Sequence, residues 1–131
     1  MNDPFTVDVQ VRYQDLDTLE HVNNAVYVSY FEHARTEYLA ARLDLDVAEY
    51  EFVVANLEIN YEASITYGQS VRVATETTAV GTTSWTMAYE IRADGEVAAT
   101  GQSTQVCLDP ETGSPVEVPD SMRETLRSRD V

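Results

Sequence analysis

The sequence contains no lysine, a single cysteine and no long hydrophobic run. Cys107 cannot form an internal disulfide, and with only two histidines in the chain little is left for a thiolate or imidazole metal site. No apolar stretch approaches the ~18–20 residues that a membrane span requires, and the N-terminus has no secretory pattern. We therefore expect a cytoplasmic protein without a metal site.

Negative charge dominates the composition. The chain carries 23 aspartate and glutamate residues against eight basic residues, all of them arginine, for a formal net charge of −15. Such a field repels phosphate backbones and anionic lipids, so we expect neither nucleic-acid nor membrane binding. Salt at ~1 M shortens the Debye length to ~3 Å and screens the self-repulsion. An acidic, lysine-free composition resembles that of proteins from salt-accumulating archaea; an acidic mesophilic protein is the alternative.

Length and hydrophobic content predict one folded domain. A chain of 131 residues, 44% of them hydrophobic, can bury a core of its own. No repeat, low-complexity stretch or linker divides it, so we expect a single domain over residues 1–131. Residues 5–13 alternate apolar and polar side chains, which is the period of a half-buried strand, and the polar residues 14–20 predict a loop.

A long amphipathic helix is predicted from Asn23 to about Leu43, because apolar residues recur at three- and four-residue steps. Arg35 falls among the polar residues that we expect mostly on the exposed face. Asn23 and Asn24 lie at the start, where a side-chain oxygen can cap free backbone N–H groups. The apolar positions are Tyr27, Tyr30, Phe31, Ala34, Tyr38 and Ala41.

The rest of the chain indicates β-structure. After an acidic connector (Asp44, Asp46 and Glu49), alternating segments begin near residues 57, 71, 85 and 97. Asp94-Gly95 is a strong hairpin signal, and we expect the last strand to break or bend near Gly101. A short helix is predicted over residues 120–127.

This element order predicts an α+β fold with a five-stranded antiparallel sheet and one long central helix. A single helix can cover only one face of such a sheet. The opposite face or an edge strand then needs a partner, so we expect dimerisation.

The densest group of polar residues lies between the first strand and the long helix. The loop holds Asp15, Asp17 and His21 within one short segment. Free N–H groups at a helix start can polarise a carbonyl oxygen, as in an oxyanion hole. An imidazole nearby can orient a carboxylate or move a proton. The loop therefore combines a base or nucleophile, an electrophilic cradle and an orienting group.

The segments Arg12-Tyr13-Gln14-Asp15-Leu16-Asp17 and His21-Val22-Asn23-Asn24-Ala25-Val26-Tyr27 carry a family resemblance. With the Tyr30-Phe31-Glu32 and Ala34-Arg35 that follow, they resemble the signature of hotdog-fold acyl-CoA thioesterases of the 4-hydroxybenzoyl-CoA thioesterase type. The resemblance extends over about residues 6–109. It implies a sheet wrapped around a central helix and hydrolysis of an acyl-CoA, or an acyl carrier protein thioester, without a cofactor. It also implies a homodimer or homotetramer with sites between subunits.

The resemblance also implies roles for individual residues. Asp17 matches the catalytic carboxylate, which attacks the thioester or activates a water. The backbone N–H at Asn24 matches the group that polarises the thioester carbonyl. His21 matches a catalytic histidine of plant-type acyl carrier protein thioesterases, but Leu19 replaces the asparagine of that network. Many bacterial relatives have glycine where this chain has Glu20.

Other residues have competing explanations. We assign Asn23 and Tyr27 to substrate binding, although Asn23 can equally cap the helix and Tyr27 can belong to the core. Asp15 is more simply explained as a turn or capping residue. Cys107 is best explained as a small buried side chain rather than a nucleophile.

Two other functions fit the same residues. One is an acyl-thioester hydratase or dehydratase on the same fold, and the other is an acyl-CoA-binding module without catalysis. Any of the three must bind CoA phosphates in a negative field, for which Arg12, Arg72 and Arg92 are available.

Overall fold

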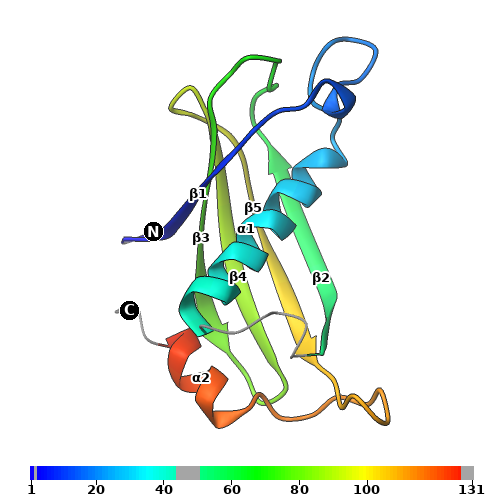
Figure 1. Ribbon diagram of the computed structural model, residues 1–131, viewed down its shortest axis with the longest axis vertical. Helices are drawn as coiled ribbons and strands as arrows, with labels where there is room; N and C mark the ends of the chain where they lie inside the picture. Colours follow the sequence, from blue (N-terminus) through cyan, green and yellow to red (C-terminus); the bar gives the residue numbers. More distant parts are fainter. Residues whose placement is uncertain (2, 44–50, 128–131) are drawn as a thin grey trace.

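The computed structural model describes residues 1, 3–43 and 51–127, which form one antiparallel sheet with a long helix across it (Figure 1). The strands are β1 (Phe5–Val9), β2 (Phe52–Tyr61), β3 (Val71–Val80), β4 (Ser84–Ala93) and β5 (Glu96–Cys107). The helices are α1 (Val26–Leu43) and α2 (Asp120–Arg127), with a 3-10 turn, η1 (Tyr13–Asp15), before α1. The predicted α+β fold with five antiparallel strands is confirmed, with α2 as a second, short helix.

The strand order in the sheet is β1-β3-β4-β5-β2. β3, β4 and β5 follow one another as hairpins, whereas β2 crosses over to pair with β5 at the far edge. The hairpin between β4 and β5 turns at Asp94 and Gly95, which both have positive φ, as the Asp-Gly signal predicts. β2 is therefore an edge strand of 10 residues.

α1 places its aromatic residues against the sheet. The residues that it buries are Tyr27, Tyr30, Phe31, Ala34, Arg35, Tyr38 and Leu39. The prediction was wrong for Arg35, which is 7% exposed, because its guanidinium donates to the Tyr89 hydroxyl on β4. It was also wrong for Ala41, which is exposed.

The core between α1 and the sheet accounts for Gly101. β5 runs unbroken through this residue, which pairs with Ile59 and Tyr89, so the predicted break is absent. A Cβ at this position would lie 2.6 Å from a ring carbon of Phe31 and would overlap the Glu58 carbonyl oxygen. Phe31 in turn stacks on Tyr89 with centroids 4.4 Å apart. Glycine is therefore required by the close approach of the Phe31 ring and the Glu58 carbonyl.

The short helix α2 and the polar loop before α1 lie at opposite ends of the fold. α2 packs beside β3 and the end of α1, at the opposite end of the molecule from the loop between β1 and α1 (Figure 1). The predicted helix over residues 120–127 is confirmed. The acidic connector at Asp44, Asp46 and Glu49 lies outside the described residues. Within the described part of the chain, no helix has the length and apolar character to cross a membrane.

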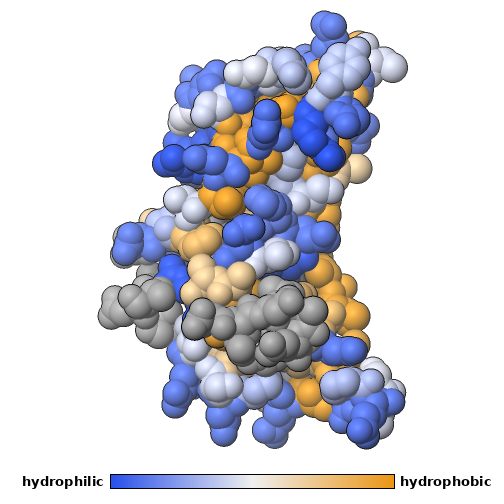
Figure 2. Space-filling view, in the orientation of Figure 1, coloured by the Kyte–Doolittle hydropathy of each residue, from blue (hydrophilic) through white to orange (hydrophobic). Residues whose placement is uncertain are grey.

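β2 exposes apolar side chains along the open edge. Val53, Val54, Leu57 and Tyr61 are between 38% and 48% exposed. Figure 2 shows hydrophobic surface down the side of the molecule where β2 lies in Figure 1. The face of the sheet away from α1 carries polar residues such as Arg72, Glu90 and Gln102 instead. Of the two surfaces expected to need a partner, the edge is therefore the apolar one.

Candidate active site

Asp17 lies at the centre of a closed turn before α1. Its backbone N–H donates to the His21 carbonyl at 2.7 Å. Its side-chain Oδ1 accepts the N–H of Leu19 at 2.8 Å and that of His21 at 3.2 Å. Within the described chain Oδ2 has no hydrogen-bond partner. The half-buried carboxylate is thus held by one oxygen and presents the other.

Asp15 ties this turn to the core. It is 3% exposed, and its carboxylate accepts bonds from the Arg12 backbone N–H, the Arg12 guanidinium and the Tyr30 hydroxyl. Burial raises the pKa of Asp15, but these bonds outweigh it and hold the pKa below its ordinary value of 3.8. Burial and the nearby carboxylate raise the pKa of Tyr30. Asp15 is a turn residue as expected, with an additional anchor on α1.

The start of α1 carries the two predicted asparagines. Asn23 Oδ1 accepts the Ala25 N–H at 2.9 Å, so this residue acts as a cap. Asn24 is exposed, and its carbonyl accepts the Tyr61 hydroxyl at 2.7 Å. The Asn24 N–H donates to no described residue. A free N–H donor therefore lies at this helix start, as an oxyanion hole requires.

His21 and Tyr27 lie at different depths. His21 is half-buried and lines a pocket, and its backbone forms an isolated antiparallel β-bridge with Thr66. Tyr27 is 2% exposed, donates its hydroxyl to the Ala63 carbonyl and packs edge-on against Tyr61. Burial raises the pKa of the Tyr27 hydroxyl. The structure thus brings His21 to the pocket and places Tyr27 in the core beneath the helix start.

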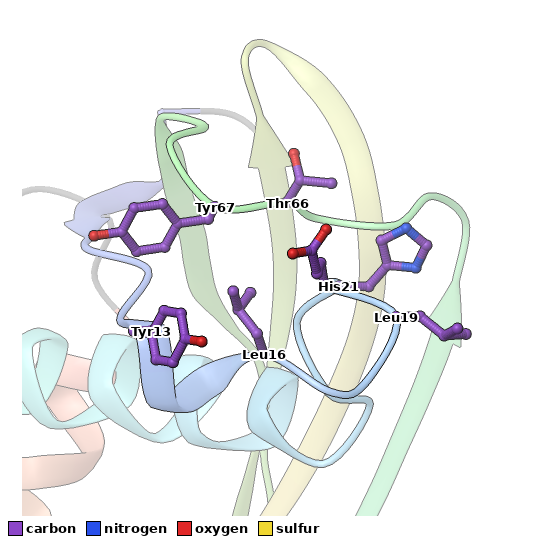
Figure 3. Close-up of a pocket in the computed structure, with 7 residues that line it drawn as sticks. Tyr13, Leu16, Leu19, His21, Thr66 and Tyr67 are labelled. Atoms are coloured by element: carbon purple, nitrogen blue, oxygen red, sulfur yellow. The ribbon is translucent and has the colours of Figure 1, made fainter.

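A pocket of about 500 Å³ adjoins the Asp17 turn. Figure 3 shows Tyr13 and Tyr67 on one side, His21 and Leu19 on the other, and Leu16 between them. Glu20 and Thr66 complete the described lining. Asp17 itself is not among these lining residues, although Leu16, Leu19, Glu20 and His21 all belong to its turn.

Sequence reasoning did not find the second wall of this pocket. Thr66 and Tyr67 come from the connection between β2 and β3, about 50 residues further along the chain than the Asp17 turn. The Val22 N–H donates to the Ile65 carbonyl at 2.8 Å, which fixes the two segments together. The chain turns at Tyr67 and Gly68, but a local turn signal says nothing about what the turn packs against.

The three arginines considered for phosphate binding all have acidic partners. Arg12 pairs with Asp15, Arg72 with Asp8, and Arg92 with Glu90. Arg12 is 68% exposed at its side chain and adjoins Tyr13 of the pocket in sequence. The arginine nearest to the pocket in the chain is therefore Arg12.

Comparison with known families gives a match over most of the chain. A family model described as the thioesterase-like superfamily matches residues 11–126. The long-chain acyl-CoA thioesterase FadM of Escherichia coli is 28% identical over 123 residues, which cover 90% of this chain and 93% of that protein.

Two solved structures are similar over nearly the whole length. A thioesterase from Thermus thermophilus, complexed with coenzyme A and Zn, is 40% identical with a TM-score of 0.89, covering 97% of this chain and 95% of that one. A predicted thioesterase from Bacillus stearothermophilus is 34% identical with a TM-score of 0.87, covering 94% and 93%.

Proposed function

The chain belongs to the thioesterase-like superfamily, and from this membership we propose that it hydrolyses acyl-CoA thioesters to a free carboxylic acid and CoA. Its homologues include named acyl-CoA thioesterases, and its structural neighbours include thioesterases. The observation that carries the proposal is the Asp17 carboxylate, which is held by one oxygen and open at the other, in a turn whose neighbouring residues Leu16, Leu19, Glu20 and His21 line a pocket.

Asp17 Oδ2 supplies the reactive electron pair. As a general base it takes a proton from a water, whose oxygen adds to the thioester carbonyl. As a nucleophile it adds directly, and water then hydrolyses the mixed anhydride. Either addition forms a tetrahedral oxyanion, which collapses with loss of the CoA thiolate. Thiolate is a good leaving group, so the carboxylate needs no further activation.

The remaining predicted residues stabilise and orient this reaction. The Asn24 N–H donates to the oxyanion, and Asn23 holds the helix start that presents it. His21 borders the pocket, where its imidazole orients the attacking group. Tyr27 supports the same helix turn from below through its bond to Ala63.

We further propose a homodimer that pairs along β2. Pairing at this edge is compatible with a tetramer made of two such dimers. An unpaired strand of 10 residues with exposed Val53, Val54 and Leu57 is an expected site of strand pairing. Tyr61 lies on this strand and bonds to Asn24. Pairing at β2 therefore places the partner close to the helix start that forms the site.

Two finer assignments belong to the same proposal. The Asp15-Leu16-Asp17 and His21–Asn24 motifs support the 4-hydroxybenzoyl-CoA thioesterase type within the superfamily. The charge of −15 without lysine supports a protein adapted to concentrated salt. The same site can act on acyl groups carried by an acyl carrier protein.

The test is thiol release from a panel of acyl-CoA and acyl carrier protein substrates. The assay is run in ~2 M salt, where the surface repulsion is screened. We expect stoichiometric release of free thiol and carboxylic acid. Hydration of an enoyl-CoA without thiol release would support the hydratase instead. Tight binding without either reaction would support a binding module, and both results would contradict the proposed hydrolysis.

A further inference from the structure

The pocket beside Asp17 is lined by apolar side chains that the core leaves out. Tyr13, Leu19 and Tyr67 are 79%, 72% and 62% exposed, and all three border this one pocket. Large apolar side chains that gather at a concave surface are typical of a ligand site. The volume of about 500 Å³ is ample for a medium-length acyl chain.

Glu20 is the acidic residue among the described side chains that line this pocket. Its φ of 64° lies in the left-handed region, which residues other than glycine adopt rarely. Its backbone N–H closes the turn onto the Asp17 carbonyl at 3.1 Å, a bond that glycine would make as well. Its carboxylate has no hydrogen bond or ion pair with the described residues. The side chain is therefore not needed for the turn, and it faces the ligand space unpaired.

Glu20 also gives the pocket its negative charge. Among the described lining residues there is no arginine, and Glu20 is the one acidic residue. The phosphates of CoA are repelled from such a surface, so the acyl end of the substrate is the part that fits it. We propose that Glu20 makes this pocket select uncharged acyl groups over acyl groups that end in a carboxylate. This inference rests on the proposed function, because it assumes that the thioester lies beside Asp17.

The experiment compares hexanoyl-CoA with adipoyl-CoA, which have acyl chains of equal length and differ by the terminal carboxylate. The kcat/KM ratio is measured at the lowest salt concentration at which the protein stays folded, because salt weakens the effect. We expect a preference for hexanoyl-CoA, and we expect Glu20→Gln to reduce that preference about five- to tenfold. Glu124→Gln removes the same charge from an exposed position of α2, at the other end of the molecule, and we expect it to leave the ratio unchanged.

Binding of the non-hydrolysable thioether analogues of both substrates separates this inference from the proposed function. If the wild type binds the neutral analogue more tightly and Glu20→Gln narrows the difference, the inference is supported even where turnover is absent. Selective binding without turnover would therefore contradict the proposed hydrolysis and leave the charge selection by Glu20 supported. Equal affinity for both analogues, or a preference that Glu20→Gln does not alter, would overturn the inference. So would a Tyr67→Ala variant that binds the neutral analogue as tightly as the wild type.

Discussion

The bond between Tyr30 and Asp15 offers a sharp test of how the Asp17 turn is held. Tyr30→Phe removes one hydroxyl and keeps the ring, which is 5% exposed in the core. In the wild type the hydroxyl donates to Asp15 Oδ2 at 2.9 Å. In the variant, that oxygen accepts a hydrogen bond only from the Arg12 backbone N–H. A hydrogen bond to a buried charged group contributes about 2 kcal/mol. For a domain of this size, that loss lowers Tm by roughly 6–10 °C.

The loss of stability caused by Tyr30→Phe should become smaller as the pH falls, because Asp15 becomes protonated. Its pKa in the folded protein lies below 3.8, so the ionised carboxylate stabilises the fold above that pH. This contribution is lost as the pH falls through the folded pKa. The difference in unfolding free energy between wild type and Tyr30→Phe should therefore be about 2 kcal/mol at pH 7, and about 1 kcal/mol once Asp15 is protonated.

Urea unfolding from pH 7 down to pH 2, in salt that keeps the protein folded, measures this difference. Wild type and Tyr30→Phe share all their other charged groups. The pH dependence of the unfolding free energy that comes from those groups therefore cancels in the difference. Tyr13→Phe is the matched control, since Tyr13 is 79% exposed and its hydroxyl makes no described bond. A difference below about 0.5 kcal/mol at neutral pH, or one that grows as the pH falls, would refute the anchoring role of Asp15.

Three further outcomes follow from the structure. Gly101→Ala should destabilise the fold by about 2–3 kcal/mol in chemical denaturation, because the new methyl group collides with Phe31 and the Glu58 carbonyl; an unchanged midpoint would contradict that packing. Leu57→Glu should shift the molar mass in light scattering from dimer towards monomer, because it places a charge on the exposed β2 edge; a retained dimer would exclude pairing at this edge. Raising KCl from ~0.1 M to ~2 M should raise Tm, since the net charge of −15 becomes screened; a flat response would contradict adaptation to salt.

Local periodicity predicted the elements that depend on near neighbours. α1 begins at Val26 rather than Asn23 because Asn23 serves as the cap, and the Asp94-Gly95 hairpin lies where its turn residues indicate. The first part of β2 was missed because Phe52–Ala55 is apolar without alternation, and such a run lacks the period by which a half-buried strand is recognised. β1 ends at Val9, earlier than the alternation to Tyr13 suggested.

Features that depend on contacts distant in sequence could not be predicted. The Arg35 guanidinium is buried because it finds the Tyr89 hydroxyl, 54 residues further along the chain. The position of β2 beside β5 is likewise a matter of sheet order, which periodicity does not contain. In the site, the motif pointed to Asp17 and its turn, whereas the wall formed by Tyr67 depends on how a second loop packs.

The most direct measurement of the central claim compares thiol release by Asp17→Asn with that by Asp94→Asn. Both replace a turn aspartate with its isosteric amide, and in both the Oδ1 acceptor of backbone N–H bonds can be kept. If the carboxylate is the base or nucleophile, kcat of Asp17→Asn falls at least about a hundredfold while its Tm stays within a few degrees, and Asp94→Asn retains wild-type kcat. An Asp17→Asn variant that is folded and hydrolyses acyl-CoA at the wild-type rate would contradict the account.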